Sequence, residues 1–166
     1  MKEKTTVYLG LGTNSGNKAE NLTRAIEELS SAIGDCTAIS SFIETEPWGF
    51  SSENSFLNCV AEFKTEKDPI ELLNTTEEIE RKLGRTAKSV NGEYQDRIID
   101  IDILLYGNEI ISNDRLTIPH SLMHQRQFVL EPLAEIAANI IHPTSGKKIA
   151  QLLKEIKQTF PGVSKK

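Results

Sequence analysis

Apolar and polar residues alternate along several segments of the chain, and this alternation predicts where its β-strands lie. Successive residues of a strand point to opposite faces of a sheet, so a half-buried strand reads as apolar, polar, apolar. Four segments have this character or are rich in β-branched residues: 5–11, 38–45, 55–63 and 97–106. The last of them is the most strand-like, and a Gly107-Asn108 turn is expected to connect it to a short strand at 109–111.

Other segments repeat apolar residues at helical spacing. One helix is predicted before Gly34 by the spacing of Leu22, Ile26, Leu29 and Ile33. A second is expected to begin after Asp68, with Pro69 first in the helix and Glu71 completing a capping box, and to end at Gly84. Two more are expected near the C-terminus, at 128–138 and 147–158.

The resulting order is strand, helix, strand, strand, helix, strand. This order predicts an α+β fold with a ferredoxin-like βαββαβ core, in which helices lie on one face of a mainly antiparallel sheet. The two C-terminal helices are additions to this core. We expect a single domain over 1–162, a loose tail at 163–166, and functional roles for the long connections at 46–54 and 85–96.

Composition narrows the classes of protein to consider. The chain has 166 residues, of which 38% are hydrophobic and 26% charged, and its net charge of −5 disfavours nucleic acid or an anionic membrane as partner. A local cluster of cations could still bind a small anion. The N-terminal residues contain no apolar targeting segment, no run is long enough to span a membrane, and Cys36 and Cys59 fit a reducing compartment, so a cytoplasmic protein is expected.

The glycines between the first strand and the first helix suggest a phosphate-binding loop, but their spacing does not fit one. A dinucleotide-binding fingerprint that begins at Gly10 requires a third glycine where Ser15 stands, and the P-loop pattern is absent. A tight strand-to-helix turn is the favoured interpretation of 10–16.

Two carboxylates in the last predicted strand form a candidate metal site. Asp100 and Asp102 share one strand face, with Cα atoms roughly 6.5–7 Å apart, whereas the neighbouring isoleucines point to the core. Such a pair can hold one or two Mg²⁺ ions together with phosphates. The alternative is a solvated strand face, but Ile98 and Leu104 on the same face predict that the aspartates are sheltered.

Cations elsewhere in the chain would suit a polyphosphate ligand. The candidates are Arg85, Lys88, Arg97, Arg115, His120 and Arg126. Scattered surface cations and a structural histidine are the alternative interpretation. Phe56 and Phe128 would ordinarily be core residues.

Four motifs together resemble the 6-hydroxymethyl-7,8-dihydropterin pyrophosphokinase family of folate biosynthesis. Asp96–Ile103 is similar to that family's R-x-x-D-x-D-[IL] signature, and Pro119–Phe128 to its P-H-x-x-M-x-x-R-x-F block. The segments Ile43–Gly49 and Phe56–Asn58 complete the pattern. The resemblance implies transfer of the pyrophosphoryl group of ATP to the pterin hydroxymethyl group, with release of AMP.

The resemblance also implies roles for individual residues. Asp100 and Asp102 would hold two Mg²⁺ ions, and Arg85 and Arg97 would assist catalysis. The residues expected at the pterin are Thr45, Trp48, Phe56, Asn58 and Phe128. The residues expected at the nucleotide are Glu80, Lys88, Arg97, Arg115, Thr117, His120 and Arg126.

Three positions depart from the family's usual residues and affect the expected nucleotide contacts. They are Ala87, where a basic residue is frequent, Tyr94, where tryptophan is common, and Ser121, where an aromatic residue is frequent. We expect a monomer whose partners are ATP and a hydroxymethyl-dihydropterin, with no nucleic acid or membrane partner. The alternatives are another Mg²⁺-dependent phosphotransferase that forms ADP, a ferredoxin-like nucleic-acid-binding module, and an inactive pterin-binding protein.

Overall fold

The computed structural model describes residues 3–45, 55–84 and 99–159 of the chain. Its first part contains β1 (Thr5–Thr13), α1 (Lys18–Ala32), β2 (Cys36–Ile39), β3 (Ile43–Thr45), β4 (Phe56–Thr65), α2 (Pro69–Gly84) and β5 (Asp100–Tyr106). Its last part contains β6 (Ile111–Ser112), β7 (Thr117–Ile118), the 3₁₀ turn η2 (Met123–Gln125), α3 (Gln127–Ala137) and α4 (Ile149–Thr159). The expected tail at 163–166 lies outside the described residues.

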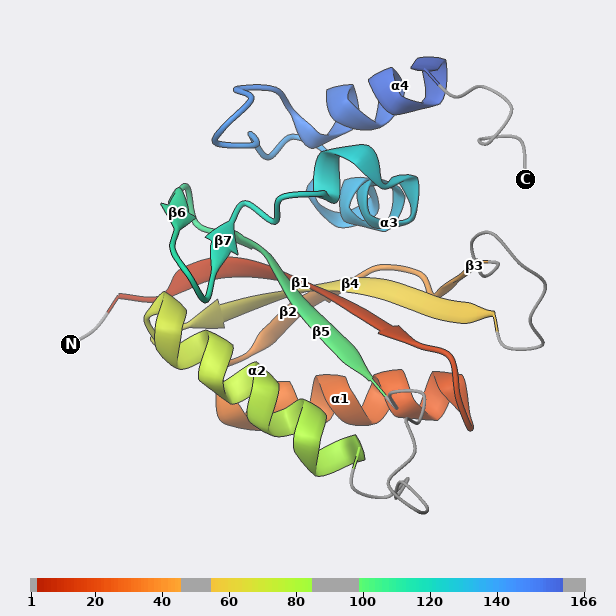
Figure 1. The fold of residues 1–166 in the computed structure, drawn as a ribbon, viewed down its shortest axis with the longest axis vertical. Coiled ribbons are helices and arrows are strands. Elements are labelled where there is room, and N and C mark those ends of the chain that lie inside the picture. Colours follow the sequence, from red (N-terminus) through yellow and green to blue (C-terminus); the bar gives the residue numbers. More distant parts are fainter. Residues whose placement is uncertain (1–2, 46–54, 85–98, 160–166) are drawn as a thin grey trace.

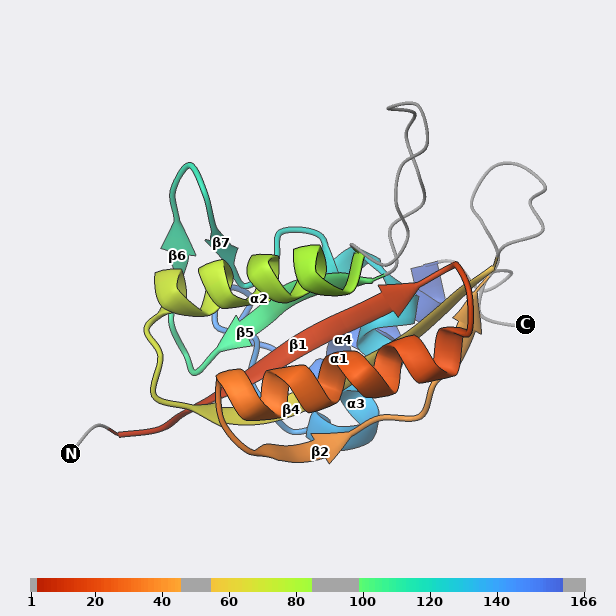
Figure 2. The same ribbon diagram turned by 90° about the horizontal axis from the view of Figure 1, so that it is seen from below.

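The main sheet has the order β2-β4-β1-β5, and β3 pairs with β4 beyond the end of β2. All of these pairings are antiparallel. Helices α1 and α2 pack on one face, and α3 and α4 lie across the other (Figure 1). In the view from below, α1 and α2 run side by side in front of the sheet (Figure 2). The predicted mixture of helices and antiparallel sheet is therefore confirmed, with helices on both faces once the C-terminal pair is included.

Each face of the sheet has its own hydrophobic core. Val7, Leu9 and Leu11 point to the α1 and α2 side, where they join a cluster that contains buried residues of both helices. Tyr8 and Leu104 point to the other side and pack with residues of α3 and α4. Alternate side chains of β1 and β5 are therefore buried in two different cores, one on each face of the sheet.

The helix boundaries follow the capping signals in the sequence. The Glu71 backbone N–H donates to Asp68 Oδ1 (2.8 Å), and the Asp68 backbone N–H donates to Glu71 Oε1 (3.0 Å), which is the predicted capping box of α2. At the start of α1, the Asn17 side chain accepts from the Glu20 N–H. None of the helices that the structure describes is long and apolar enough to cross a membrane.

The predicted strand at 38–45 is divided in two. Its break falls at Ser40, whose backbone N–H donates to the Val60 carbonyl and whose hydroxyl accepts from the Val60 N–H, both at 2.9 Å. Beside it, the backbone N–H and hydroxyl of Ser41 both donate to the Glu135 carboxylate of α3 (2.7 and 2.5 Å). Serine side chains compete with regular ladder bonding in this way, and the strand pattern alone does not reveal it.

A buried histidine organises the connection between α3 and α4. His142 is 5% exposed, and its Nδ1 accepts a hydrogen bond from the Ser145 N–H (3.1 Å). Its backbone N–H donates to the Lys147 carbonyl, and its carbonyl accepts from the Gly146 N–H (both 2.8 Å). Burial, and next the charge of the nearby His124, lower the pKa of His142 below its ordinary value. The folded loop therefore favours a neutral imidazole.

We expect the protein to lose stability as the pH falls from about 7.5 to 5.5, since histidine in an unfolded chain has a pKa of about 6.5. In that range the unfolded state binds more protons than the folded state, because the folded pKa is lower. Thermal unfolding of His142→Asn should show a weaker pH dependence than the unsubstituted chain. Asparagine keeps an acceptor for Ser145 but does not titrate. An equal loss of stability in both proteins would contradict the assignment.

Candidate active site

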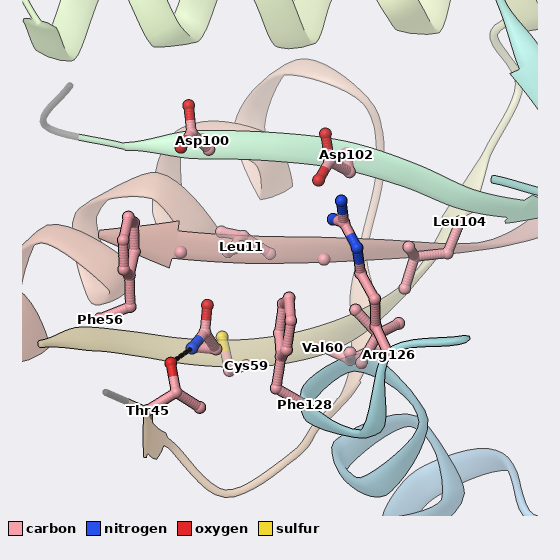
Figure 3. Close-up of a pocket in the computed structure, with 14 residues that line it drawn as sticks. Leu11, Thr45, Phe56, Cys59, Val60, Asp100, Asp102, Leu104, Arg126 and Phe128 are labelled. Atoms are coloured by element: carbon pink, nitrogen blue, oxygen red, sulfur yellow. Dashed lines mark hydrogen bonds between the residues drawn. The ribbon is translucent and has the colours of Figure 1, made fainter. Parts of the chain in front are cut away.

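A cavity of about 380 Å³ opens on the sheet face that α3 and α4 cover only in part. Residues of β1, β4 and β5 form its floor, and Thr45, Arg126, Phe128 and Val129 line its side. In Figure 3 the three strands lie side by side, with β5 above β1 and β4 below it. The aspartate pair and four predicted pterin-side residues thus meet in one pocket: Thr45, Phe56, Asn58 and Phe128.

Two glycines of β1 form the middle of the pocket floor. Gly10 and Gly12 lie within β1, which continues to Thr13 and pairs there with Leu57, so the interpretation of 10–16 as a strand-to-helix turn is wrong for 10–13. The turn itself is shorter and falls between Thr13 and the start of α1 at Lys18. Of the three glycines in this segment, Gly16 has the positive φ (66°) that is typical of a turn. Glycine is a weak strand former, so propensity suggested an earlier end to β1. The signal that could have found the floor is a G-x-G repeat on one strand face.

The strand register places functional side chains on both sides of these glycines. Gly12 is opposite Asn58 on β4 and opposite Asp100 on β5. Gly10 is opposite Val60 and Asp102 in the same way. Two residues without side chains therefore stand between the aspartates of β5 and the residues of β4.

Asp100 and Asp102 share the pocket face of β5, as the alternation predicted, while Ile101 and Ile103 are buried in the opposite core. Asp100 is half-buried, but Asp102 is exposed, so the prediction that both are sheltered is wrong for Asp102. Its neighbour across the ladder is Gly10, which offers no side chain to cover it. Leu104, the next residue on this face, is covered because it packs with α3 and α4.

Two aromatic rings stand at the pocket. Phe56 comes from the start of β4 and Phe128 from the first turn of α3, and Figure 3 shows both rings rising from the same side of the floor. Phe128 is 39% exposed, so it is not an ordinary core residue. The Arg126 guanidinium lies 5.6 Å from the Phe128 ring centre. Cation–π contact at this distance supports the ring from one side.

Asn58 lies in the floor near these rings. It is 8% exposed, and its side-chain nitrogen donates to Thr45 Oγ1 at 3.0 Å (the dashed line in Figure 3). A buried amide with one remaining N–H and a carbonyl oxygen can read the polar edge of a heterocycle. The expected pterin-side residues Thr45, Phe56, Asn58 and Phe128 all line the pocket, whereas Trp48 lies outside the described residues.

His120 lies close to two charged residues of the pocket, Asp102 and Arg126. Its backbone N–H donates to the Leu104 carbonyl (3.0 Å), and its Nδ1 accepts from the Leu122 N–H (3.2 Å). Burial lowers the pKa of His120, Asp102 opposes that shift, and Arg126 adds to it. Figure 3 shows the Arg126 guanidinium pointing toward Asp102. The predicted nucleotide-side residues His120 and Arg126 are thus brought to one end of the aspartate pair.

Three other predicted nucleotide-side residues lie outside this pocket. Arg115 forms an ion pair with Glu77 of α2 (3.0 Å), and Thr117 is exposed on β7. Glu80 of α2 accepts a hydrogen bond from the Ile101 N–H at 2.7 Å. None of these three is among the described residues that line the pocket. The described residues do not include three further candidates, Arg85, Lys88 and Arg97, or the unusual residues Ala87 and Tyr94. Ser121, the third unusual residue, is exposed.

The donors in the pocket fit magnesium better than a softer metal. Among the described residues there is no group of three or more His, Cys, Asp or Glu that could hold a metal ion. Magnesium is commonly held by one or two carboxylates, with water and substrate phosphates as its other ligands. The hard oxygen donors of Asp100 and Asp102 therefore suit an ion that arrives with a phosphate compound.

The fold and the pocket define an α+β protein in which two aromatic rings and a carboxylate pair line one pocket. Comparison with known proteins specifies it further: residues 8–138 match the family model described as 7,8-dihydro-6-hydroxymethylpterin-pyrophosphokinase. The chain belongs to this family, and the resemblance seen in its motifs is confirmed.

Two relatives are similar in sequence over most of their length, and a solved structure is similar in fold. The 2-amino-4-hydroxy-6-hydroxymethyldihydropteridine pyrophosphokinase of Porphyromonas gingivalis is 46% identical over 138 residues, which cover 82% of this chain and 93% of that protein. The enzyme of the same name from Haemophilus influenzae is 41% identical over 151 residues, covering 90% of this chain and 92% of that one. The wild-type HPPK-DHPS of Plasmodium falciparum with pteroate has a similar fold, with a TM-score of 0.77 at 15% identity; the match covers 98% of this chain and 46% of that one.

The bond between Glu80 and the edge of β5 gives a test of how the aspartate pair is supported. We expect Glu80→Ala to lower the free energy of unfolding by about 1–2 kcal/mol, because the Ile101 N–H between the two aspartates loses its acceptor. Glu80→Gln retains an acceptor oxygen and should lose less. Urea unfolding of the three proteins measures this. Equal losses in both variants would show that the carboxylate charge, not the hydrogen bond, is what matters.

Proposed function

We propose that this chain transfers the pyrophosphoryl group of ATP to the hydroxyl of 6-hydroxymethyl-7,8-dihydropterin and releases AMP, as a step of folate biosynthesis. The observation that carries the proposal is the presence of two aromatic rings and two carboxylates in one pocket. Family membership supports the same reaction. Of the classes considered from the sequence, only a pterin phosphotransferase uses both parts of this site.

The pterin is placed between Phe56 and Phe128, over the glycine floor. Stacking of a flat heterocycle on aromatic rings is favourable, and here both rings line the same pocket as the buried Asn58 amide. Asn58 would bond the polar edge of the pterin, and Thr45 would hold that amide in place. The hydroxymethyl group would then lie toward β5, where Asp100 and Asp102 stand.

Two Mg²⁺ ions are proposed at Asp100 and Asp102, each completed by phosphate oxygens of ATP; bound magnesium neutralises phosphate charge and polarises the reacting oxygens. The chain itself supplies Arg126, at the end of the pocket near Asp102 and His120. Arg85, Lys88 and Arg97 are proposed as further phosphate ligands, and Glu80, Arg115 and Thr117 as nucleotide contacts. Phosphoryl transfer depends mainly on such positioning and charge neutralisation.

The remaining expectations accompany this function. The strand order and antiparallel pairings support interpretation of the core as ferredoxin-like, with α3 and α4 as additions. We infer a single domain that acts as a monomer in the cytoplasm, with ATP and the pterin as its partners. A net charge of −5 supports the exclusion of nucleic acid.

The identity of the nucleotide product tests the proposed reaction. The protein is incubated with ATP, Mg²⁺ and 6-hydroxymethyl-7,8-dihydropterin, and the products are separated by ion-exchange chromatography. We expect AMP in an amount equal to the pterin diphosphate formed. ADP in its place would indicate the rival phosphotransferase, and no turnover would overturn the proposal of an enzyme.

Substitution of the aspartates tests the metal site. Asp100→Asn and Asp102→Asn should each lower kcat by at least roughly 100-fold, since each removes a carboxylate ligand of the metal that would neutralise phosphate charge. Asp114→Asn, at an exposed position of the β6–β7 hairpin, is the matched control and should retain activity. Circular dichroism confirms that each variant is folded. Near-normal turnover of both site variants would show that these aspartates do not hold the metal.

A further inference from the structure

Gly12 lies at the point of closest packing in the pocket floor. It sits in the regular part of β1, opposite Asn58 on one side and Asp100 on the other, and it is buried. The glycines with positive φ are others, so the backbone of Gly12 does not require glycine for its conformation. A strand interior normally disfavours glycine. Some other constraint must explain its presence here.

The constraint is the side chain of Asn58. A Cβ atom at Gly12 would lie 2.7 Å from Asn58 Oδ1, closer than real Cβ contacts allow, and 3.9 Å from the Phe56 ring. The Asn58 amide therefore occupies the space that a side chain at position 12 would need. Its other end is fixed, because the side-chain nitrogen donates to Thr45 Oγ1. The amide is thus held between β1 and β3, with its oxygen beside Gly12 and its nitrogen bonded to Thr45.

We propose that Gly12 is a positioning residue for pterin recognition: the missing side chain lets the Asn58 amide lie in the floor in the one orientation that Thr45 fixes. This inference rests on the proposed function, since it assigns the polar edge of the pterin to that amide. In this orientation the second N–H and the oxygen lone pairs of Asn58 remain to bond a ring with adjacent donors and acceptors. A side chain at position 12 would push the amide off Thr45 or up into the space of the ring.

Gly10 provides a matched comparison within the same strand. It lies two residues earlier on the same face and is also a pocket residue. A Cβ atom there would lie 3.4 Å from Leu104 Cδ1, an ordinary apolar contact with a flexible side-chain end. Alanine at position 10 therefore displaces no polar group. The two substitutions make the same chemical change and differ in whether they move Asn58.

A double-mutant cycle tests the inference. Gly12→Ala and Gly10→Ala are each made in the unsubstituted chain and in Asn58→Ala, and pterin affinity and the KM values for pterin and ATP are measured. We expect Gly12→Ala to weaken pterin binding roughly tenfold to a hundredfold, the loss typical of a misplaced hydrogen-bonding group, with the KM for ATP within about twofold. In Asn58→Ala, the same substitution should change pterin affinity by less than about twofold. Gly10→Ala should have the same effect in both backgrounds.

Side-chain amide signals in a ¹H–¹⁵N NMR spectrum give a readout that needs no ligand. The Asn58 signals should move in Gly12→Ala and keep their positions in Gly10→Ala. Unmoved Asn58 signals in Gly12→Ala, or equal losses of pterin affinity with and without Asn58, would overturn the inference. If Gly12→Ala does not fold, Asn58→Ala should restore folding to the double variant, and failure to do so would also overturn it.

The two proposals can fail separately. If the unsubstituted chain binds the pterin but the cycle shows no coupling, the role of Gly12 is wrong and the proposed function stands. If the unsubstituted chain does not bind the pterin, the proposed function fails, and the assignment of Gly12 to pterin recognition fails with it.

Discussion

Strand β1 is paired along both of its edges, and the geometry of the site depends on that double pairing. Because β1 is antiparallel to both β4 and β5, its register sets which residue of one outer strand stands across from which residue of the other. The side-chain period of a strand is two, so a slip of one residue would send the aspartates into the core. The apolar residues on the opposite face, such as Leu9 and Ile103, resist such a slip because they are buried against α1 and α2. The hydrophobic core on one face therefore specifies the chemistry on the other.

The pocket occupies the part of the second face that α3 and α4 leave uncovered. Along β5, the pocket face runs from Asp100 and Asp102 to Leu104, which packs under these helices. Along β1 it runs from the glycines to Tyr8, which belongs to the same core. Core and site are thus consecutive portions of the same strands. The first turn of α3 forms the boundary between them, which explains why Phe128 can be a pocket wall although α3 is otherwise a packing helix.

The sequence was sufficient to predict the elements whose signal is local. The long strands β1, β4 and β5, the capping box at Asp68 and the shared face of Asp100 and Asp102 follow from periodicity and short-range hydrogen bonding. The short strand expected at 109–111 is β6 at Ile111–Ser112, and β7 was not predicted. Features that depend on contacts distant in sequence could not be predicted in this way. The break at Ser40 is made by a bond to Val60, and the exposure of Asp102 depends on a glycine in a strand about ninety residues earlier. Gly10 and Gly12 were assigned to a turn because closely spaced glycines occur both in turns and on a strand face without side chains.

Strand β3 shows how such distant contacts fix a binding residue that its own three residues could not hold. A strand of this length has few ladder bonds, yet Thr45 must keep its hydroxyl at the Asn58 amide. On the other side of the strand, Glu44 accepts a hydrogen bond from the Ser55 hydroxyl (2.5 Å), and Lys18 of α1 donates to the Ser55 carbonyl (2.9 Å). The chain just before β3 is bonded to Glu135 of α3. Helices from both layers thus converge on β3, so a short strand at the edge of the site is held without a long ladder.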